Sequence, residues 1–188
     1  MKLGILGGSF NPIHHGHLLI ATRAAEALGL DRVLLIPASV SPLKSAGALA
    51  PPRHRLAMVR MAVRGNRRLG ASDLEIRRGG TSYTVDTLKS LKGRYGGPLY
   101  LIVGADAARL LPRWRSIGEV MRLAKVVVVG RPGHRSNGKL PKVLMVDGPL
   151  LEISSTEIRH RVKRGQSVRY LVPEGVERYI RRKRLYRA

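Results

Sequence analysis

Short apolar runs alternate with helical patterns from one end of this 188-residue chain to the other, and this alternation restricts the folds open to it. Several runs place Val, Ile and Leu on consecutive positions, and residues 126–129 are four valines in a row. Consecutive apolar residues are typical of strands covered on both faces, and strands that alternate with helices form parallel sheets. The pattern therefore predicts an α/β protein.

The expected architecture is a Rossmann-like open parallel sheet with helices on both faces and a small C-terminal helical part. Strands are predicted at Lys2 to Leu6, Arg32 to Pro37, Gly70 to Ile76, Leu99 to Val103, Lys125 to Val129 and Val143 to Val146. Helices are predicted at 16–27, 52–64 and 82–91, and again after Thr156 and after Pro173. We expect one domain, residues 1–188, in which about 154–188 form the helical part.

The amino-acid composition limits the cellular locations and the kinds of binding partner that we expect for the protein. The chain has no cysteine, which excludes disulfide scaffolds and thiolate chemistry and favours a reducing, cytoplasmic location. No apolar run approaches the roughly 18 residues that a membrane helix needs.

Lys and Arg outnumber Asp and Glu by 35 to 12, and eleven of the basic residues lie in the last thirty positions. Such a surface attracts anions. We interpret it as a solvated helix face, with nucleic-acid binding as an alternative that the few aromatic residues do not favour.

The most informative segment is GGSFNPIHHGH, residues 7–17, between the first predicted strand and the first predicted helix. A glycine turn there allows backbone amides and a helix N-terminus to approach a phosphate. His14 and His17 are three residues apart at the helix start, so that they can face the same way. Imidazoles at this place can donate hydrogen bonds to phosphoryl oxygens and, when protonated, offset the charge that develops in phosphoryl transfer. A metal site is not favoured, because no Asp or Glu lies nearby.

A second segment, ISSTEIR at residues 153–159, also begins a helix. Taken alone it is a helix cap. Combined with the first segment, its hydroxyls, free amides and Arg159 would form a second anion cradle opposite the histidines.

These two segments together resemble the nucleotidyltransferase superfamily that shares an HxGH element with class I aminoacyl-tRNA synthetases. Within it the chain is most similar to the bacterial nicotinate-nucleotide adenylyltransferases, because SYTVDTL at 82–88, GAD at 104–106 and LPRW at 111–114 match in order and spacing. The resemblance spans Lys2 to about Leu185. It implies transfer of AMP from ATP to nicotinate mononucleotide, which gives nicotinate adenine dinucleotide and pyrophosphate in NAD biosynthesis.

The resemblance also implies roles for individual residues. His14 and His17 would contact the reacting phosphates as catalytic groups. ATP would be bound by Gly8, Ser9, Phe10, Gly104, Asp106, Ile153, Ser155, Thr156 and Arg159. The nicotinate nucleotide would be bound by Ser9, Lys44, Thr84, Trp114 and Arg115.

Mg²⁺ would arrive on the ATP oxygens, with no metal ligand from protein side chains. Two departures from the family pattern are Asn11, where many relatives carry Asp, and Arg115 after the tryptophan. Pantetheine-phosphate adenylyltransferase is the alternative activity, although that family lacks the 82–88 and Trp114 blocks. The protein could also form a homodimer, although no feature of the sequence indicates an interface.

Overall fold

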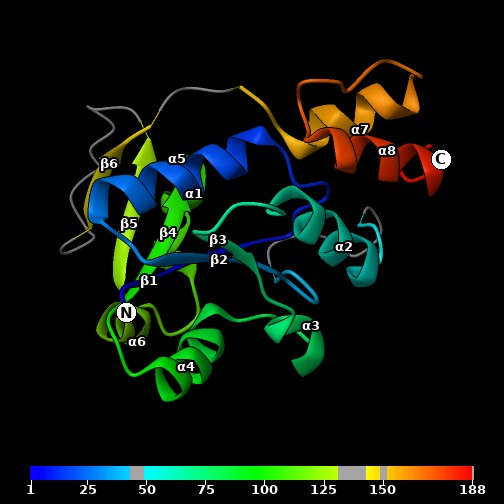
Figure 1. The fold of residues 1–188 in the computed structure, drawn as a ribbon. Helices are drawn as coiled ribbons and strands as arrows, with labels where there is room; N and C mark the ends of the chain where they lie inside the picture. Colours follow the sequence, from blue (N-terminus) through cyan, green and yellow to red (C-terminus); the bar gives the residue numbers. More distant parts are fainter. Residues whose placement is uncertain (43–48, 131–142, 149–151, 188) are drawn as a thin grey trace.

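Parallel strands form the centre of the structure, a computed structural model that describes residues 1–42, 49–130, 143–148 and 152–187. Within these ranges six strands form one sheet in the order β3-β2-β1-β4-β5-β6, and every neighbouring pair is parallel (Figure 1). The strands are β1 (Leu3–Gly8), β2 (Arg32–Pro37), β3 (Leu69–Ala71), β4 (Leu99–Gly104), β5 (Lys125–Gly130) and β6 (Leu144–Asp147). The strand order reverses between β1 and β4, and sheets of this kind bind ligands at that point, outside the carboxyl ends of the strands.

Helices cover both faces of the sheet, as the sequence predicts. They are α1 (His15–Leu28), α2 (Pro52–Ala62), α3 (Leu74–Arg78), α4 (Thr84–Tyr95), α5 (Ala105–Ala108), the 3₁₀ helix η2 (Leu111–Arg113), α6 (Ile117–Leu123), α7 (Ser155–Lys163) and α8 (Glu174–Arg182). Figure 1 shows α1 on one side of the sheet and α4 and α6 on the other, with α7 and α8 together at one end. The predicted Rossmann-like fold with a C-terminal helical part is thereby confirmed.

Two hydrophobic clusters, one on each face, hold the layers together. Leu6 and Leu35 point into the cluster beneath α1, α2, α7 and α8, whereas Ile5 and Leu34 point into the cluster beneath α4 and α6. Neighbouring residues of one strand face opposite ways, so a strand covered on both faces must be apolar at every position. This explains the runs of consecutive aliphatic residues in the sequence.

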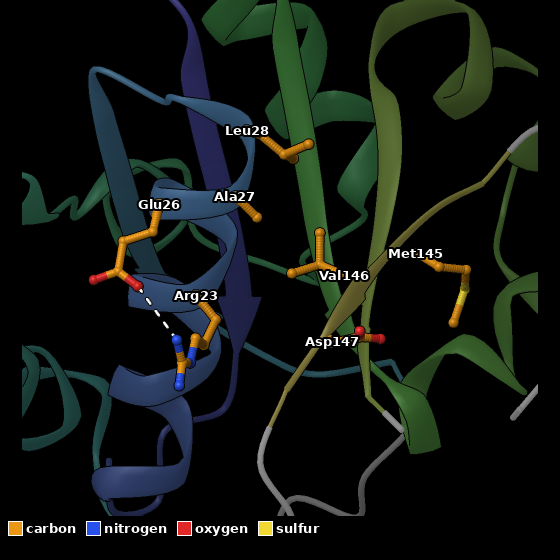
Figure 2. Close-up of a pocket in the computed structure, with 7 residues that line it drawn as sticks. All are labelled: Arg23, Glu26, Ala27, Leu28, Met145, Val146 and Asp147. Atoms are coloured by element: carbon orange, nitrogen blue, oxygen red, sulfur yellow. Dashed lines mark ion pairs between the residues drawn. The ribbon is translucent and has the colours of Figure 1, made fainter. Parts of the chain in front are cut away.

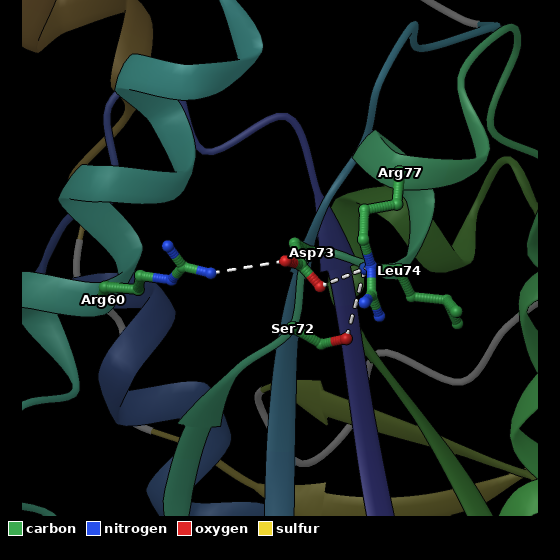
Figure 3. Close-up of polar contacts among 5 residues, drawn as sticks. All are labelled: Arg60, Ser72, Asp73, Leu74 and Arg77. Carbon is green, nitrogen blue, oxygen red and sulfur yellow. Dashed lines mark hydrogen bonds and ion pairs between the residues drawn. The ribbon is translucent and has the colours of Figure 1, made fainter.

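The predicted strand at Gly70 to Ile76 is wrong beyond its first residues. Strand β3 ends at Ala71, and the chain then turns into the short helix α3. The Leu74 amide donates to the Ser72 hydroxyl at 3.3 Å, and the Asp73 carboxylate forms ion pairs with Arg77 at 3.1 Å and Arg60 at 3.4 Å (Figure 3). An Asp before a helix with an Arg four residues later favours a helical turn. The strand was predicted there because Leu74 and Ile76 alternate with polar residues, a pattern that is also typical of a strand.

Other differences concern the ends of elements and one segment without a prediction. Strand β1 continues into the glycines, because Gly7 and Gly8 still pair with residues of β2. The helices α5, η2 and α6, at residues 105–123, are short and were not predicted from periodicity. No helix in the described ranges combines the length and apolar character needed to cross a membrane.

Candidate active site

The turn between β1 and α1 forms the centre of the candidate site, at the carboxyl end of β1 and beside β4. Phe10 adopts a φ of 44°, an uncommon conformation for a residue with a side chain, and its ring is buried. A Cβ on Gly8 would lie 3.3 Å from that ring. A side chain at position 8 would therefore crowd the Phe10 ring, which is tightly packed in the turn.

The two predicted histidines lie against each other. The ring centroids of His14 and His17 are 3.7 Å apart with a tilt of 30°, and the Phe10 ring meets His17 edge-on at 4.9 Å. The His14 amide donates to His17 Nδ1 at 3.3 Å. Because Nδ1 accepts this bond, the neutral His17 ring carries its proton on Nε2.

His14 is buried, and its surroundings keep the ring uncharged. Burial, together with the neighbouring His15, lowers the pKa of His14 to about 4. Its Nδ1 is buried without a hydrogen-bond partner among the described residues. A Cβ on Gly16 would lie only 3.0 Å from this nitrogen, so the glycine makes room for the ring. In the free protein His14 is therefore a neutral hydrogen-bonding group and not a cation, in contrast to the protonated form considered from the sequence.

The start of α7 meets the turn directly, although the two segments are far apart in sequence. The Ser155 hydroxyl donates to the Pro12 carbonyl at 2.8 Å, and the Arg159 guanidinium donates to the Asn11 carbonyl at 3.0 Å. Arg159 also donates to the Thr156 hydroxyl at 3.2 Å. Ser154 caps α7 by accepting from the Glu157 amide at 3.1 Å. The structure thus brings together the two segments that the sequence singled out.

Asn11 ties the same turn to two further segments. Its side-chain oxygen accepts from the Ala50 amide and from the Tyr186 hydroxyl, both at 2.9 Å. Burial raises the pKa of Tyr186, so the hydroxyl keeps the proton that it donates. An aspartate oxygen could accept the same two bonds, which explains why Asn11 is compatible with a pattern that often has Asp.

The predicted residues on the other side of the sheet form a second group around the start of α4. Thr84 is the first residue of α4, and the Arg115 guanidinium lies 4.5 Å from the centre of the Tyr83 ring. Trp114 is partly buried against the cluster beneath α4 and α6, and its Nε1 is buried without a partner among the described residues.

The remaining predicted residues lie at strand or helix ends, with one exception. Gly104 ends β4, and Asp106 is exposed in the first turn of α5. The Ile153 carbonyl oxygen lies 3.8 Å from the position of a Cβ on Gly16, next to the histidine turn. Lys44 lies outside the described residues.

Two buried nitrogens, His14 Nδ1 and Trp114 Nε1, are the only buried side-chain polar atoms without a partner in the described part of the chain. Buried polar atoms in folded proteins nearly always have a partner, so each such atom needs an explanation. Both belong to predicted site residues, one in each group.

Sequence reasoning missed two buried charged residues close to the site. Arg55 on α2 donates to the Ser9 carbonyl at 2.9 Å, and Glu75 on α3 accepts from the Thr87 hydroxyl at 2.6 Å. Burial raises the pKa of Glu75 and lowers that of Arg55. The signal was present for Arg55, because it precedes the buried Val59 by four residues and so shares its helix face.

No group of three His, Asp or Glu side chains in the described ranges is arranged to hold a metal ion. Hard cations such as Mg²⁺ need several oxygen ligands, and near the histidines the polar groups are imidazoles, hydroxyls, amides and Arg159. This donor set suits an anion.

A surface pocket lies at the other end of α1. It is lined by Arg23, Glu26, Ala27, Leu28, Met145, Val146 and Asp147. Figure 2 shows these side chains on α1 and β6, with the Arg23–Glu26 ion pair of 3.7 Å on α1. None of them is a predicted site residue.

Comparisons with known proteins agree with the geometry. The chain matches the cytidylyltransferase-like family over residues 5–161. It is 47% identical to a probable nicotinate-nucleotide adenylyltransferase of Roseiflexus sp., with 98% of each chain covered, and 43% identical to one of Opitutus terrae, with 100% of this chain and 98% of the relative covered.

Solved structures share the fold. A nicotinic acid mononucleotide adenylyltransferase of Plasmodium falciparum, in complex with NaAD, superimposes with a TM-score of 0.79 at 21% identity, covering 98% of this chain and 97% of that one. A putative nicotinate-nucleotide adenylyltransferase of Vibrio parahaemolyticus gives 0.73 at 21% identity, covering 99% and 95%.

Proposed function

Because this chain belongs to the nicotinate-nucleotide adenylyltransferase family, within the cytidylyltransferase-like nucleotidyltransferases, we propose that the histidine turn and the start of α4 together transfer AMP from ATP to nicotinate mononucleotide. An oxygen of the mononucleotide phosphate attacks the α-phosphorus of ATP in line. The bond from that phosphorus to the bridging oxygen breaks, so nicotinate adenine dinucleotide forms and pyrophosphate leaves. One domain, residues 1–188 with 154–188 as its helical part, carries out this cytoplasmic reaction.

The observation that carries the proposal is the stacked pair His14 and His17 at the start of α1, with a buried and unpartnered nitrogen on His14. The attacking phosphate oxygen is already ionised at neutral pH, so the reaction needs no general base. The site has to align two polyanions and to stabilise charge on the pentavalent phosphorus. Neutral His14 and the Nε2 proton of His17 suit this task, because each ring can donate a hydrogen bond to a phosphate oxygen.

On the ATP side we assign binding to backbone amides and to the start of α7. Gly8, Ser9 and Phe10, in the turn, contact the nucleotide through their backbone. Asp106, beside Gly104, binds a ribose hydroxyl. Ile153 also binds ATP, and Ser155, Thr156 and Arg159 contact its phosphates. The support for this assignment is the contact of Ser155 and Arg159 with the carbonyls of the same turn. Mg²⁺ enters as part of the ATP complex and neutralises phosphate charge there.

On the pyridine side we assign Trp114 to stacking on the ring of the nicotinate nucleotide. Thr84 meets the carboxylate through its backbone amide at the start of α4, where a helix N-terminus favours an anion. Arg115, already placed over Tyr83, adds positive charge near the carboxylate, and Ser9 and Lys44 contact the phosphate.

The test is pyrophosphate release from Mg-ATP with nicotinate mononucleotide, nicotinamide mononucleotide and phosphopantetheine offered separately. We expect turnover with the nicotinate compound, and a lower rate with the nicotinamide compound because it lacks the carboxylate. Turnover with phosphopantetheine alone would replace the proposal by the pantetheine-phosphate activity.

A further inference from the structure

A cation with no carboxylate partner lies in the interior next to the histidine turn. Arg55 on α2 is 1% exposed and is one of the largest fully buried side chains. None of the ion pairs within the described residues includes it. Burying a charge without an opposite charge is costly, so folding stability alone does not favour arginine at this position.

The guanidinium instead uses its donors on three backbone carbonyls. Nε donates to Ala50, Nη1 to Ser9 and Nη2 to Ser39, each at 2.9 Å. These carbonyls belong to three separate segments: the chain entering α2, the turn after β1 and the chain after β2. Arginine presents its donors in a rigid planar fork, so one side chain fixes the relative positions of all three segments.

The hydrogen bonds continue from Ser39 to the other half of the site. The Ser39 amide donates to the Ser82 hydroxyl at 2.9 Å, and the Ser82 amide donates to the Val40 carbonyl at 2.9 Å. Ser82 lies two residues before Thr84, the first residue of α4. A partly buried chain of bonds therefore runs from Ser9 through Arg55, Ser39 and Ser82 to the start of α4.

We propose that Arg55 is a positioning residue that fixes the spacing between the ATP-side turn and the pyridine-side start of α4. This inference rests on the proposed function, in which those two segments bind the two substrates. Arg55 acts through the Ser9 and Ser39 carbonyls and does not reach either substrate. Misplacing reacting groups by about 1 Å can lower a rate by roughly 100-fold, so a small change in this spacing affects turnover strongly.

The main test compares Arg55→Lys with wild type, and uses Arg53→Lys on the exposed side of the same helix as the matched control. Lysine keeps the charge but loses the fork. At a temperature well below the melting point of the less stable variant, we expect Arg55→Lys to lower kcat by about tenfold or more, with KM for each substrate near its wild-type value. Arg53→Lys should match wild type. A normal kcat in Arg55→Lys, with only the melting temperature lowered, would show a purely structural role and overturn the proposal.

A second variant and a second measurement keep the inference testable if Arg55→Lys folds poorly. Ser82→Ala breaks the same chain at its far end, so it should lower kcat in the same direction and by a smaller factor. The double variant should lose less than the product of the two single effects, because both act on Ser39. If the two substitutions lowered kcat by strictly multiplicative factors, Arg55 and Ser82 would not act through the same chain of hydrogen bonds.

Hydrogen exchange separates this inference from the proposed activity, because it needs no turnover. In Arg55→Lys, amides of residues 7–17 and 38–42 should exchange faster than in wild type, and those of α6 should not change. If wild type releases no pyrophosphate but these segments exchange faster in the variant, the proposed activity fails, while the finding that Arg55 holds these segments in place stands. If wild type turns over and neither segment changes, the positioning role fails.

Discussion

The two halves of the site are held in different ways. On the ATP side, the carbonyls of Ser9, Asn11 and Pro12 each accept a hydrogen bond from a distant side chain, so polar bonds fix the turn. On the pyridine side, Trp114 is held by packing and Arg115 by its contact with the Tyr83 ring. Directional bonds fix positions more closely than apolar contact does. The half that we propose to hold the reacting phosphates is thus the more rigidly built around its turn, while Trp114 and Arg115, which we propose to select the substrate, rely on shape, even though Ser82 hydrogen-bonds to Ser39 and Val40.

The largest effect should come from the rigid half. We predict that His17→Ala lowers kcat by about 100-fold or more while the fold survives, because His17 serves mainly in the transition state. Steady-state pyrophosphate release and a thermal melt measure the two quantities. His15→Ala, the neighbouring histidine, serves as the control. Turnover close to wild type in His17→Ala would remove the proposed catalytic role.

A second prediction uses the uncharged state of His14. Its pKa in the folded protein, about 4, lies below the ordinary value of 6.5, so the unfolded chain binds a proton first as the pH falls. The contribution to stability is present above pH 6.5 and is lost progressively between pH 6.5 and pH 4, by about 3 kcal/mol at most.

Denaturant unfolding across that range, compared between wild type and His14→Gln, measures this contribution. The difference between the two proteins is the useful quantity, because Glu75, whose pKa is raised by burial, acts in the opposite direction in both. Parallel curves for the two proteins would show that His14 is not the group that titrates.

A substitution of Trp114, on the pyridine side, should change KM for only one of the two substrates. Trp114→Ala should raise KM for nicotinate mononucleotide by about tenfold or more, since stacking on an aromatic side chain contributes roughly 1–3 kcal/mol per ring. KM for ATP should stay near wild type. Trp114→Phe retains a stacking surface and should recover part of the loss. An equal rise in both KM values would identify Trp114 as a packing residue.

The smallest effect concerns the link between the turn and the C-terminal segment. Tyr186→Phe removes one donor to Asn11 and should lower the free energy of unfolding by about 1 kcal/mol. Denaturant melts at neutral pH measure it, and Tyr170→Phe, an exposed tyrosine, is the control. An unchanged midpoint would show that the Ala50 amide alone satisfies the Asn11 side chain.

Sequence patterns were sufficient for the sheet and for the two motif segments, and insufficient for what supports them. Consecutive aliphatic residues predict the buried strands, and the position of the histidine segment between a strand and a helix predicts the histidine turn. The helix face of Arg55 indicates that it is buried, but its contacts with the turn could not be predicted until the carbonyls that surround it were known. The strand prediction at 70–76 failed because Asp73 and Arg77 favour a helical turn that apolar alternation does not reveal.

The hydrogen bond between Asn11 and Tyr186 joins residues separated by 175 positions. During synthesis the ribosome adds the tyrosine that completes the turn only after the turn itself and the strands of the described sheet have been made. A nascent chain that already contains both histidines and all six strands therefore still lacks one of the side chains that hold its nucleotide turn in place. This stabilising contact of the turn can therefore form only after synthesis has passed residue 186, although the other residues of the turn are present much earlier.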